Sequence, residues 1–279
     1  MAILARVSGN DALVGDARKT YGEIRRHARE AFLPLSTTLE LTLQCNLRCV
    51  HCYNFDRDEP RPSFESLRRP RLPIAGAPEA GRNGTPLSDA EVMALIDDLY
   101  EAGCLFLAFS GGEALVHPSL PELVRHARSR GMVVTLKTNG LLLGEMSAAL
   151  AAAGAGRVEV SLYGAVAATH DAFVQVPGSF ERSVAGIRAA RAAGLSARVS
   201  FVLSRRNADE VPAMLELANS LGVRCGMDPH LTARYDEASS SRAPIDLRVD
   251  REILERLYRG PFRGQIPAEG EDRGVQCGC

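Results

Sequence analysis

Two hydrophobic periods follow one another along most of the chain, and together they predict strands and helices in turn. Short apolar runs at 104–109, 132–137, 157–162, 196–203 and 223–228 predict buried strands, and the alternating stretch 37–43 predicts a further one. Helical spacing predicts helices at 119–130, 143–153 and 179–194, and one that Asn207 or Asp209 caps and that ends near Leu221. A capping box formed by Ser88 and Glu91 starts another helix, which Gly103 ends.

This alternation of strands and helices is typical of βα units on a parallel sheet. Six strands fit an α/β fold, a partial (β/α)6 TIM-like barrel, and a doubly wound sheet fits almost as well. In both, the carboxyl ends of the strands meet at one edge, where α/β proteins place their chemistry. The residues that directly follow each strand are therefore the candidates for a functional site.

The periodic core is flanked by less regular sequence. We expect an N-terminal extension at 1–34, in which 11–31 could form an amphipathic helix, and a barrel at 35–228 that carries a loop insertion at 54–87. A short, irregular C-terminal extension follows at 229–279, with a short helix at 251–260. The sequence ends on Cys277 and Cys279, which suggests that the natural protein continues.

Composition excludes several classes of function. The formal net charge of the 279 residues is -1, which gives no general attraction to nucleic acid or to a membrane surface. The start does not resemble a signal peptide, and no apolar run is long enough to span a membrane. We expect a cytoplasmic protein, in which the seven cysteines stay reduced and are better suited to metal binding or catalysis than to disulfides.

Three cysteines stand close together directly after the first predicted strand. The segment CNLRCVHCY holds Cys45, Cys49 and Cys52. Structural zinc would need a fourth ligand, and His51 would crowd the site between two of the cysteines. An iron–sulfur cluster is normally held by four thiolates, so three would leave one iron open to another molecule. This asymmetry favours a catalytic cluster over a plain electron carrier.

The next strands end in polar or glycine-rich turns. Ser110, Gly111, Gly112 and Glu113 follow the strand 104–109, and the two glycines would let the backbone approach a ligand closely. The turn that contains Asn139 follows the third strand, and by itself it is an ordinary Asn-Gly turn. Ser161 lies at the end of the fourth strand, where a lone serine is usually a cap.

In this order, the four segments resemble the radical S-adenosylmethionine (SAM) enzymes, over about residues 35–228. The resemblance implies that Cys45, Cys49 and Cys52 hold a [4Fe-4S] cluster whose fourth iron binds SAM, and that the reduced cluster cleaves SAM to start radical chemistry. It implies that the turn Ser110–Glu113 holds the SAM amino group and that Asn139 lines the site. It further implies that His51 lies near the adenine, that Ser161 contacts the ribose or carboxylate, and that Arg182 reaches the carboxylate.

The segments SLYGA and LSRRNADE and the stretch around PGSFER look most like radical SAM enzymes of the SPASM and twitch types, which modify peptides or build cofactors. The resemblance implies a peptide or small-molecule substrate and an electron donor such as flavodoxin or ferredoxin. Cys225, Cys277 and Cys279 are too few for a complete auxiliary-cluster region, so that region is truncated or absent. Cys104 opens a buried strand and is expected to be a core thiol, and His170 and Asp171 are expected to fix a loop.

The alternative is an iron–sulfur or zinc protein without radical catalysis, acting as an electron carrier or an interaction module. Such a carrier would need none of the turns after the later strands.

Overall fold

The computed structural model describes residues 17–53, 87–234 and 243–260. The strands are β1 Ser36–Glu40, β2 Phe106–Ser110, β3 Val133–Thr138, β4 Arg157–Leu162, β5 Ser196–Val202 and β6 Arg224–Asp228. The α-helices are α1 Ala17–Glu30, α2 Asp89–Glu101, α3 Leu120–Ser129, α4 Leu143–Ala152, α5 Ala167–Val174, α6 Ser179–Ala192, α7 Val211–Ser220 and α8 Arg251–Arg259. Short 3-10 turns are η3 Ala114–Val116, η4 Ala208–Glu210 and η5 Ile245–Leu247.

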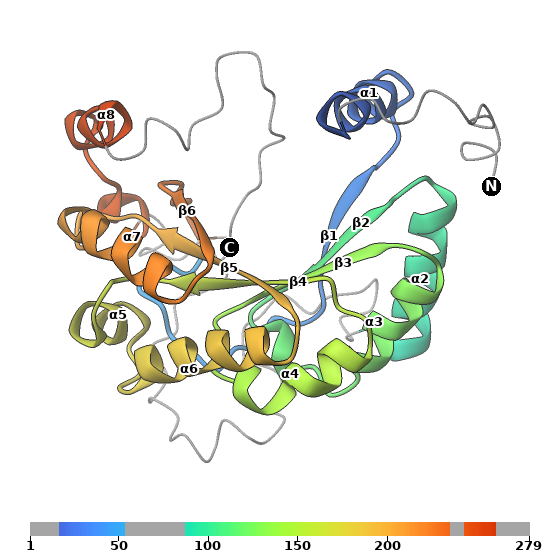
Figure 1. Cartoon of the computed structure of the whole chain (residues 1–279), viewed down its shortest axis with the longest axis horizontal. Coiled ribbons are helices and arrows are strands. Elements are labelled where there is room, and N and C mark those ends of the chain that lie inside the picture. The colour runs from blue at the N-terminus through green and yellow to red at the C-terminus, as the bar shows by residue number, and fades with distance from the viewer. Residues whose placement is uncertain (1–16, 54–86, 235–242, 261–279) are drawn as a thin grey trace.

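All six strands are parallel and form one curved sheet in the order β1-β2-β3-β4-β5-β6. In a doubly wound sheet the strand order reverses at a switch point. The strands of this sheet follow one another in sequence order, so the fold is the open barrel. Helices α2, α3, α4, α6 and α7 lie on the convex side of the sheet, and α1 and α8 stand near its two ends (Figure 1). Among the described residues, no strand closes the sheet between β1 and β6.

The helix boundaries follow from local sequence chemistry. The hydroxyl of Ser88 accepts a hydrogen bond from the Glu91 N–H at 3.3 Å, and the Glu91 carboxylate accepts one from the Ser88 N–H at 2.8 Å, so the predicted capping box is confirmed. After α2, Gly103 adopts a φ of +99° and ends the helix as predicted.

The sequence analysis missed one helix and was wrong about the start of another. The short helix α5 was missed, because its eight residues carry almost no amphipathic pattern and it is held by tertiary contacts. Neither Asn207 nor Asp209 caps α7, which begins at Val211 after the turn η4. The side chain of Asn207 is fully buried and donates instead to the carbonyls of Tyr163 and Val202, both at 2.9 Å.

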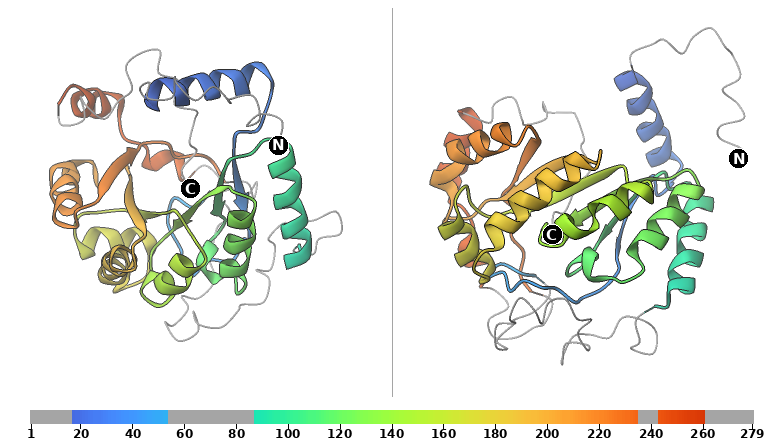
Figure 2. Two further views of the ribbon diagram at one scale, coloured as in Figure 1. Left: turned by 45° about the vertical axis from the view of Figure 1, so that its right-hand side comes forward. Right: turned by 60° about the horizontal axis from the view of Figure 1, so that its bottom comes forward.

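The main hydrophobic core lies between the convex face of the sheet and the helices (Figure 2). On β4, Val158, Val160 and Leu162 are fully buried there, whereas Glu159 and Ser161 face the concave side. This alternation follows from the two-residue period of a strand. Cys104 is fully buried in the same core, so its assignment as a core thiol is confirmed.

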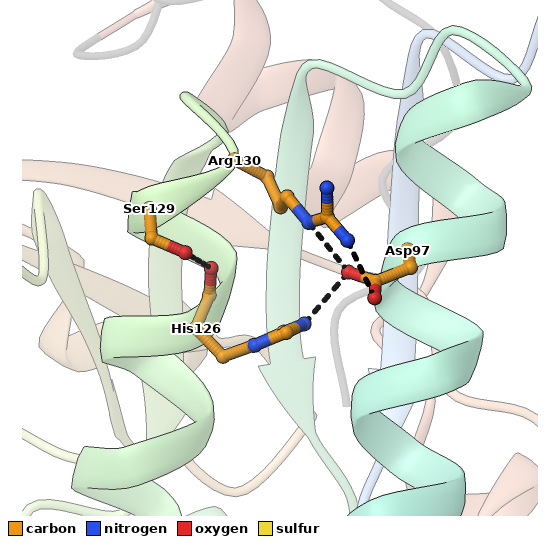
Figure 3. Close-up of polar contacts among 4 residues, drawn as sticks. All are labelled: Asp97, His126, Ser129 and Arg130. Atoms are coloured by element: carbon orange, nitrogen blue, oxygen red, sulfur yellow. Dashed lines mark hydrogen bonds and ion pairs between the residues drawn. The ribbon is translucent and has the colours of Figure 1, made fainter.

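A polar contact joins α2 to α3 at the convex surface (Figure 3). Asp97 on α2 accepts hydrogen bonds from Nε2 of His126 and from Nε of Arg130, both at 2.7 Å, and Nη2 of Arg130 pairs with its second oxygen at 2.7 Å. This bidentate pairing with Arg130 lowers the pKa of the Asp97 carboxyl. The contact fixes the angle between the two helices, far from the carboxyl edge of the sheet.

Several predicted features lie outside the described residues, namely 11–16 of the first helix, 54–86 of the predicted loop, and Cys277 and Cys279. No helix of the described part of the chain is long and apolar enough to cross a membrane.

Candidate functional site at the carboxyl edge of the sheet

The cysteine loop, residues 41–53, leaves β1 and crosses the carboxyl edge of the sheet. Its thiols at Cys45, Cys49 and Cys52 are all half-buried, and none is in a disulfide. The sulfur of Cys45 accepts a hydrogen bond from the N–H of Leu47 at 3.4 Å, a contact that favours a thiolate. The three thiols therefore lie on one loop at the carboxyl edge of the sheet, as predicted from their position after the first strand.

Helix α5 anchors the far side of this loop. The N–H of Arg48 donates to the carbonyl of Val174 at 3.1 Å, and the N–H of Val50 donates to that of Phe173 at 3.0 Å. Both carbonyls belong to the last turn of α5, where carbonyls have no partner within the helix. The helix that the sequence analysis missed thus determines the course of the backbone on both sides of Cys49.

His51 lies in an aromatic cluster formed with Tyr163 and Phe173. Its ring centroid is 4.9 Å from each of theirs, and these two rings stack on one another at 5.0 Å. Burial lowers the pKa of His51 to about 4, so the imidazole is neutral at neutral pH. Its Nδ1 is buried and has no hydrogen-bond partner among the described residues.

The Gly-Gly turn after β2 packs directly on the beginning of the cysteine loop. Gly112 donates its N–H to the carbonyl of Thr42 at 2.6 Å, and Glu113 donates its N–H to that of Gln44 at 2.8 Å. A Cβ on Gly111 would lie 2.3 Å from the Thr42 carbonyl oxygen, and one on Gly112 would lie 2.3 Å from that of Gln44. Only glycine permits this approach, so the two segments form one unit.

Glu113 is the buried hub of this unit. Its carboxylate accepts hydrogen bonds from the N–H of Leu115 at 3.0 Å, the hydroxyl of Thr138 at 2.7 Å and the N–H of Asn139 at 2.7 Å. Burial raises the pKa of Glu113, and the three donors oppose that shift. The carboxylate therefore ties the end of β3 to the Gly-Gly turn.

The side-chain amide and the backbone carbonyl of Asn139 are all hydrogen-bonded to other residues. Its Nδ2 donates to Oδ1 of Asn46 at 2.6 Å, its Oδ1 accepts from the N–H of Leu141 at 3.0 Å, and its carbonyl accepts from the hydroxyl of Ser183 at 2.7 Å. Asn46 lies between the first two cysteines of the loop. Asn139 thus positions the cysteine loop as well as its own turn.

The other predicted site residues lie on β2, β4 and α6. Ser110 ends β2 and is buried, and Ser161 is half-buried on the concave face of β4. Arg182 is half-buried in the first turns of α6, the helix that also carries Ser183. The carboxylate of Asp171 accepts three hydrogen bonds from Gly178, Ser179 and Phe180 at the start of α6. Nδ1 of His170 accepts one from the N–H of Tyr163 at 3.3 Å, so both residues fix the local backbone as expected.

The profile of the Radical SAM superfamily matches residues 39–218 of this chain. The chain belongs to the radical SAM superfamily. It is 37% identical over 184 residues to the AdoMet-dependent heme synthase of Methanosarcina barkeri, which covers 66% of this chain and 46% of that protein. It is 34% identical over 190 residues to the PqqA peptide cyclase of Xanthomonas campestris pv. campestris, covering 68% of this chain and 45% of that protein. The chain thus spans less than half the length of these relatives.

The fold of this radical SAM chain also matches solved structures. Streptococcus suis SuiB bound to S-adenosylmethionine aligns with a TM-score of 0.61 at 15% identity, covering 89% of this chain and 53% of SuiB. At that identity the likeness shows the fold alone, and it agrees with the open barrel of parallel strands.

The residues of this radical SAM chain suit the cofactors of the family, a [4Fe-4S] cluster and SAM. The described residues hold no group of three His, Cys, Asp or Glu side chains that could bind a single metal ion. A cubane cluster distributes its thiolate ligands over different irons, so they need not converge on one point. The three thiols on one loop, none of them in a disulfide, supply the right donors, and the glycine turn leaves no side chain between backbone and ligand.

Sequence reasoning missed some residues of this centre. Thr138, Asn46 and Phe173 hold Glu113, Asn139 and His51 respectively. Thr138 and Asn46 are adjacent to predicted site residues, and that adjacency was the only signal available in the sequence. Phe173 lies on the missed helix α5, so no signal pointed to it.

Proposed function

We propose that this chain is the catalytic core, at residues 35–228, of a radical SAM enzyme that modifies a peptide or a cofactor precursor. When bound, the reduced cluster supplies the electron that cleaves SAM into methionine and a 5′-deoxyadenosyl radical, which takes a hydrogen atom from the substrate. Cys45, Cys49 and Cys52 would hold the cluster. The residues Gly111, Gly112 and Glu113 would receive the SAM amino group, and Ser161 and Arg182 would contact its ribose or carboxylate.

One observation carries this proposal: the glycine turn and the cysteine loop are a single hydrogen-bonded unit. The two bonds that Gly112 and Glu113 donate to the loop join the proposed SAM-binding turn to the segment that leads into Cys45. A plain metal carrier has no use for a turn held this close to its thiols. On the same loop, the ring of His51 packs against Tyr163 and Phe173, which holds the residue beside Cys52 in place.

The substrate class rests on the relatives. One is named for heme synthesis and one for peptide cyclisation, and a structure of SuiB holds its precursor peptide SuiA. A reducing cytoplasm would keep the cysteine thiols out of disulfides. An electron donor such as flavodoxin or ferredoxin would reduce the cluster. The same proposal includes an auxiliary iron–sulfur cluster, for which Cys225 of β6 would join Cys277 and Cys279 of the C-terminal extension.

The test is 5′-deoxyadenosine formation. We expect the anaerobically reconstituted chain to form it from SAM and dithionite, and the Cys45→Ala/Cys49→Ala/Cys52→Ala variant to form none. Cys104→Ala, which removes a core thiol away from the loop, should retain activity. An intact cluster without SAM binding, or zinc in place of iron, would overturn the proposal in favour of a metal protein without radical chemistry.

Glu113→Gln tests the assignment within the turn. The amide has one acceptor oxygen where the carboxylate has two, so it cannot satisfy all three donors, and it carries no charge toward an ammonium group. We expect SAM to bind at least tenfold more weakly while the iron content stays unchanged. Unchanged SAM affinity would remove Glu113 from the site.

A further inference from the structure

A chain of hydrogen bonds fixes the side-chain amide of Asn46, the residue that follows Cys45. The N–H of Leu141 donates to Oδ1 of Asn139 at 3.0 Å, and a backbone N–H can only donate. Nδ2 of Asn139 is therefore the donor toward Asn46, whose Oδ1 accepts it at 2.6 Å. If the amide of Asn46 were turned over, two NH2 groups would meet at that distance. Oδ1 of Asn46 thus faces Asn139, and its Nδ2 lies on the opposite side of the amide.

The nitrogen of this amide lacks an acceptor. Asn46 is 3% exposed, and its Nδ2 is buried without a hydrogen-bond partner among the described residues. Buried amide nitrogens are nearly always bonded, because one without an acceptor keeps its full desolvation penalty. Since Asn139 imposes the orientation, Asn46 cannot turn its nitrogen toward another partner without losing the bond to Oδ1. The acceptor of this donor must come from outside the described residues.

The position of Asn46 on the cysteine loop points to sulfur as that acceptor. The residue lies between Cys45 and Cys49, and all three thiols of the loop are half-buried and outside any disulfide. The N–H of Leu47, the next residue, already donates to the sulfur of Cys45 at 3.4 Å. Hydrogen bonds to the sulfurs of an iron–sulfur cluster are one of the means by which a protein sets its reduction potential.

Asn46 differs in one respect from His51, a second residue of the loop with a buried nitrogen, Nδ1, that has no partner among the described residues. A neutral imidazole can carry its proton on either nitrogen, so Nδ1 of His51 can be a donor or an acceptor. An amide nitrogen can only donate, and the bonds from Leu141 through Asn139 leave Asn46 one orientation. Asn46 therefore presents a donor of defined direction, whereas His51 does not.

We propose that Nδ2 of Asn46 donates a hydrogen bond to a sulfur of the [4Fe-4S] cluster and thereby raises the reduction potential of that cluster; this inference rests on the proposed function. The reduced cluster carries one more negative charge than the oxidised one, so a donor stabilises the reduced form more. Asn139 would serve this bond from behind, because it keeps the oxygen of the Asn46 amide turned away from the cluster.

The experiment measures the midpoint potential of the cluster in the reconstituted full chain without SAM, by a redox titration followed by EPR. Asn46→Leu keeps the branched shape of asparagine, removes its polar atoms and adds no charge. At the midpoint of the parent chain, we expect the ratio of reduced to oxidised cluster to fall roughly tenfold, which is about 59 mV for one electron. ENDOR of the reduced parent cluster should show a coupled proton that exchanges in D2O and is absent in this variant.

Two further variants separate the donor from the folding of the loop. Asn46→Asp keeps an oxygen for Nδ2 of Asn139 and puts a carboxylate oxygen in place of the donor. At pH 8 it should load as much iron as the parent chain and lower the same ratio by more than tenfold, because a negative charge replaces the donor. The matched control is Asn219→Leu at an exposed asparagine of α7, which should change the ratio by less than twofold.

The outcomes separate this inference from the proposed function. An unchanged midpoint potential in Asn46→Leu and Asn46→Asp, with the cluster intact, would overturn the inference. Failure of both variants to load iron would overturn it as well, because Asn46 would then serve folding alone. An unchanged potential together with weaker SAM binding would overturn it by assigning the donor to the SAM carboxylate. An intact parent cluster that does not cleave SAM would refute the proposed function and leave the potentials comparable.

Discussion

Replacing Gly112 by alanine tests whether the glycine turn and the cysteine loop are one unit. The added Cβ would lie 2.3 Å from the Gln44 carbonyl oxygen and 2.6 Å from that of Leu43. Both contacts are to backbone, so no side chain can rotate away, and the loop must retreat by about 1 Å. That retreat weakens the hydrogen bonds from Gly112 to Thr42 and from Glu113 to Gln44.

The magnitude follows from these two effects. Overpacking costs about 1–3 kcal/mol, and each weakened hydrogen bond adds up to about 1 kcal/mol. We expect Gly112→Ala to lower the free energy of unfolding of the apoprotein by about 3 kcal/mol, measured by urea denaturation. Because the displaced segment leads into Cys45, the iron bound on reconstitution should fall as well.

The matched control is Gly144→Ala. A Cβ on Gly144 would meet nothing within 4 Å, and the residue lies in α4. Alanine is the better helix former, so this variant should be neutral or up to about 1 kcal/mol more stable. If Gly112→Ala were within 0.5 kcal/mol of the parent chain by the same assay, roughly the range of a neutral surface change, the close approach described here would be refuted.

Three other predictions concern the loops around the site, and urea denaturation of the apoprotein checks each. Asn207→Ala should cost about 3 kcal/mol, because its buried amide bonds partners on two strand ends, whereas the exposed Asn219→Ala should cost almost nothing; similar losses for both would contradict this. Asp171→Ala should cost about 2 kcal/mol by leaving three donors at the start of α6 without their acceptor, and a neutral result would show that α6 begins at Ser179 without this carboxylate. Burial lowers the pKa of His170 to about 4, so folding favours its neutral form, and its contribution to stability is lost as pH falls from about 6.5 toward 4. His170→Asn keeps an acceptor for the N–H of Tyr163 and should flatten this loss by roughly 2 kcal/mol at pH 5; parallel pH profiles would exclude the histidine as the cause.

The sequence predicted the strands well because each has a strong local signal. The buried runs that became β2 to β6 were found to within two residues, and the turns after them marked the edge where the site lies. The choice between an open barrel and a doubly wound sheet could not be made from the sequence, because strand order is set by long-range packing. The structure decided it.

The contacts inside the site were beyond the reach of sequence reasoning for a similar reason. Glu113 was predicted to face a ligand, but its position depends on Thr138 and on the Asn139 N–H, from another strand end. His51 was predicted from its place in the motif, whereas its burial depends on Phe173 of α5, a helix with no amphipathic pattern. Both cases join residues far apart in the chain.

The absence of a hydrogen-bonded seam between β1 and β6 in the described structure has a mechanical consequence. In a closed barrel the strand number and shear fix the radius, so the interior has one size. In this open sheet the curvature is the sum of five pairwise strand twists, each of which can change by a few degrees without breaking a bond. Small changes where the helices pack on the sheet can therefore widen or narrow the interior. The same arrangement of strands can in this way be adapted to ligands of very different size.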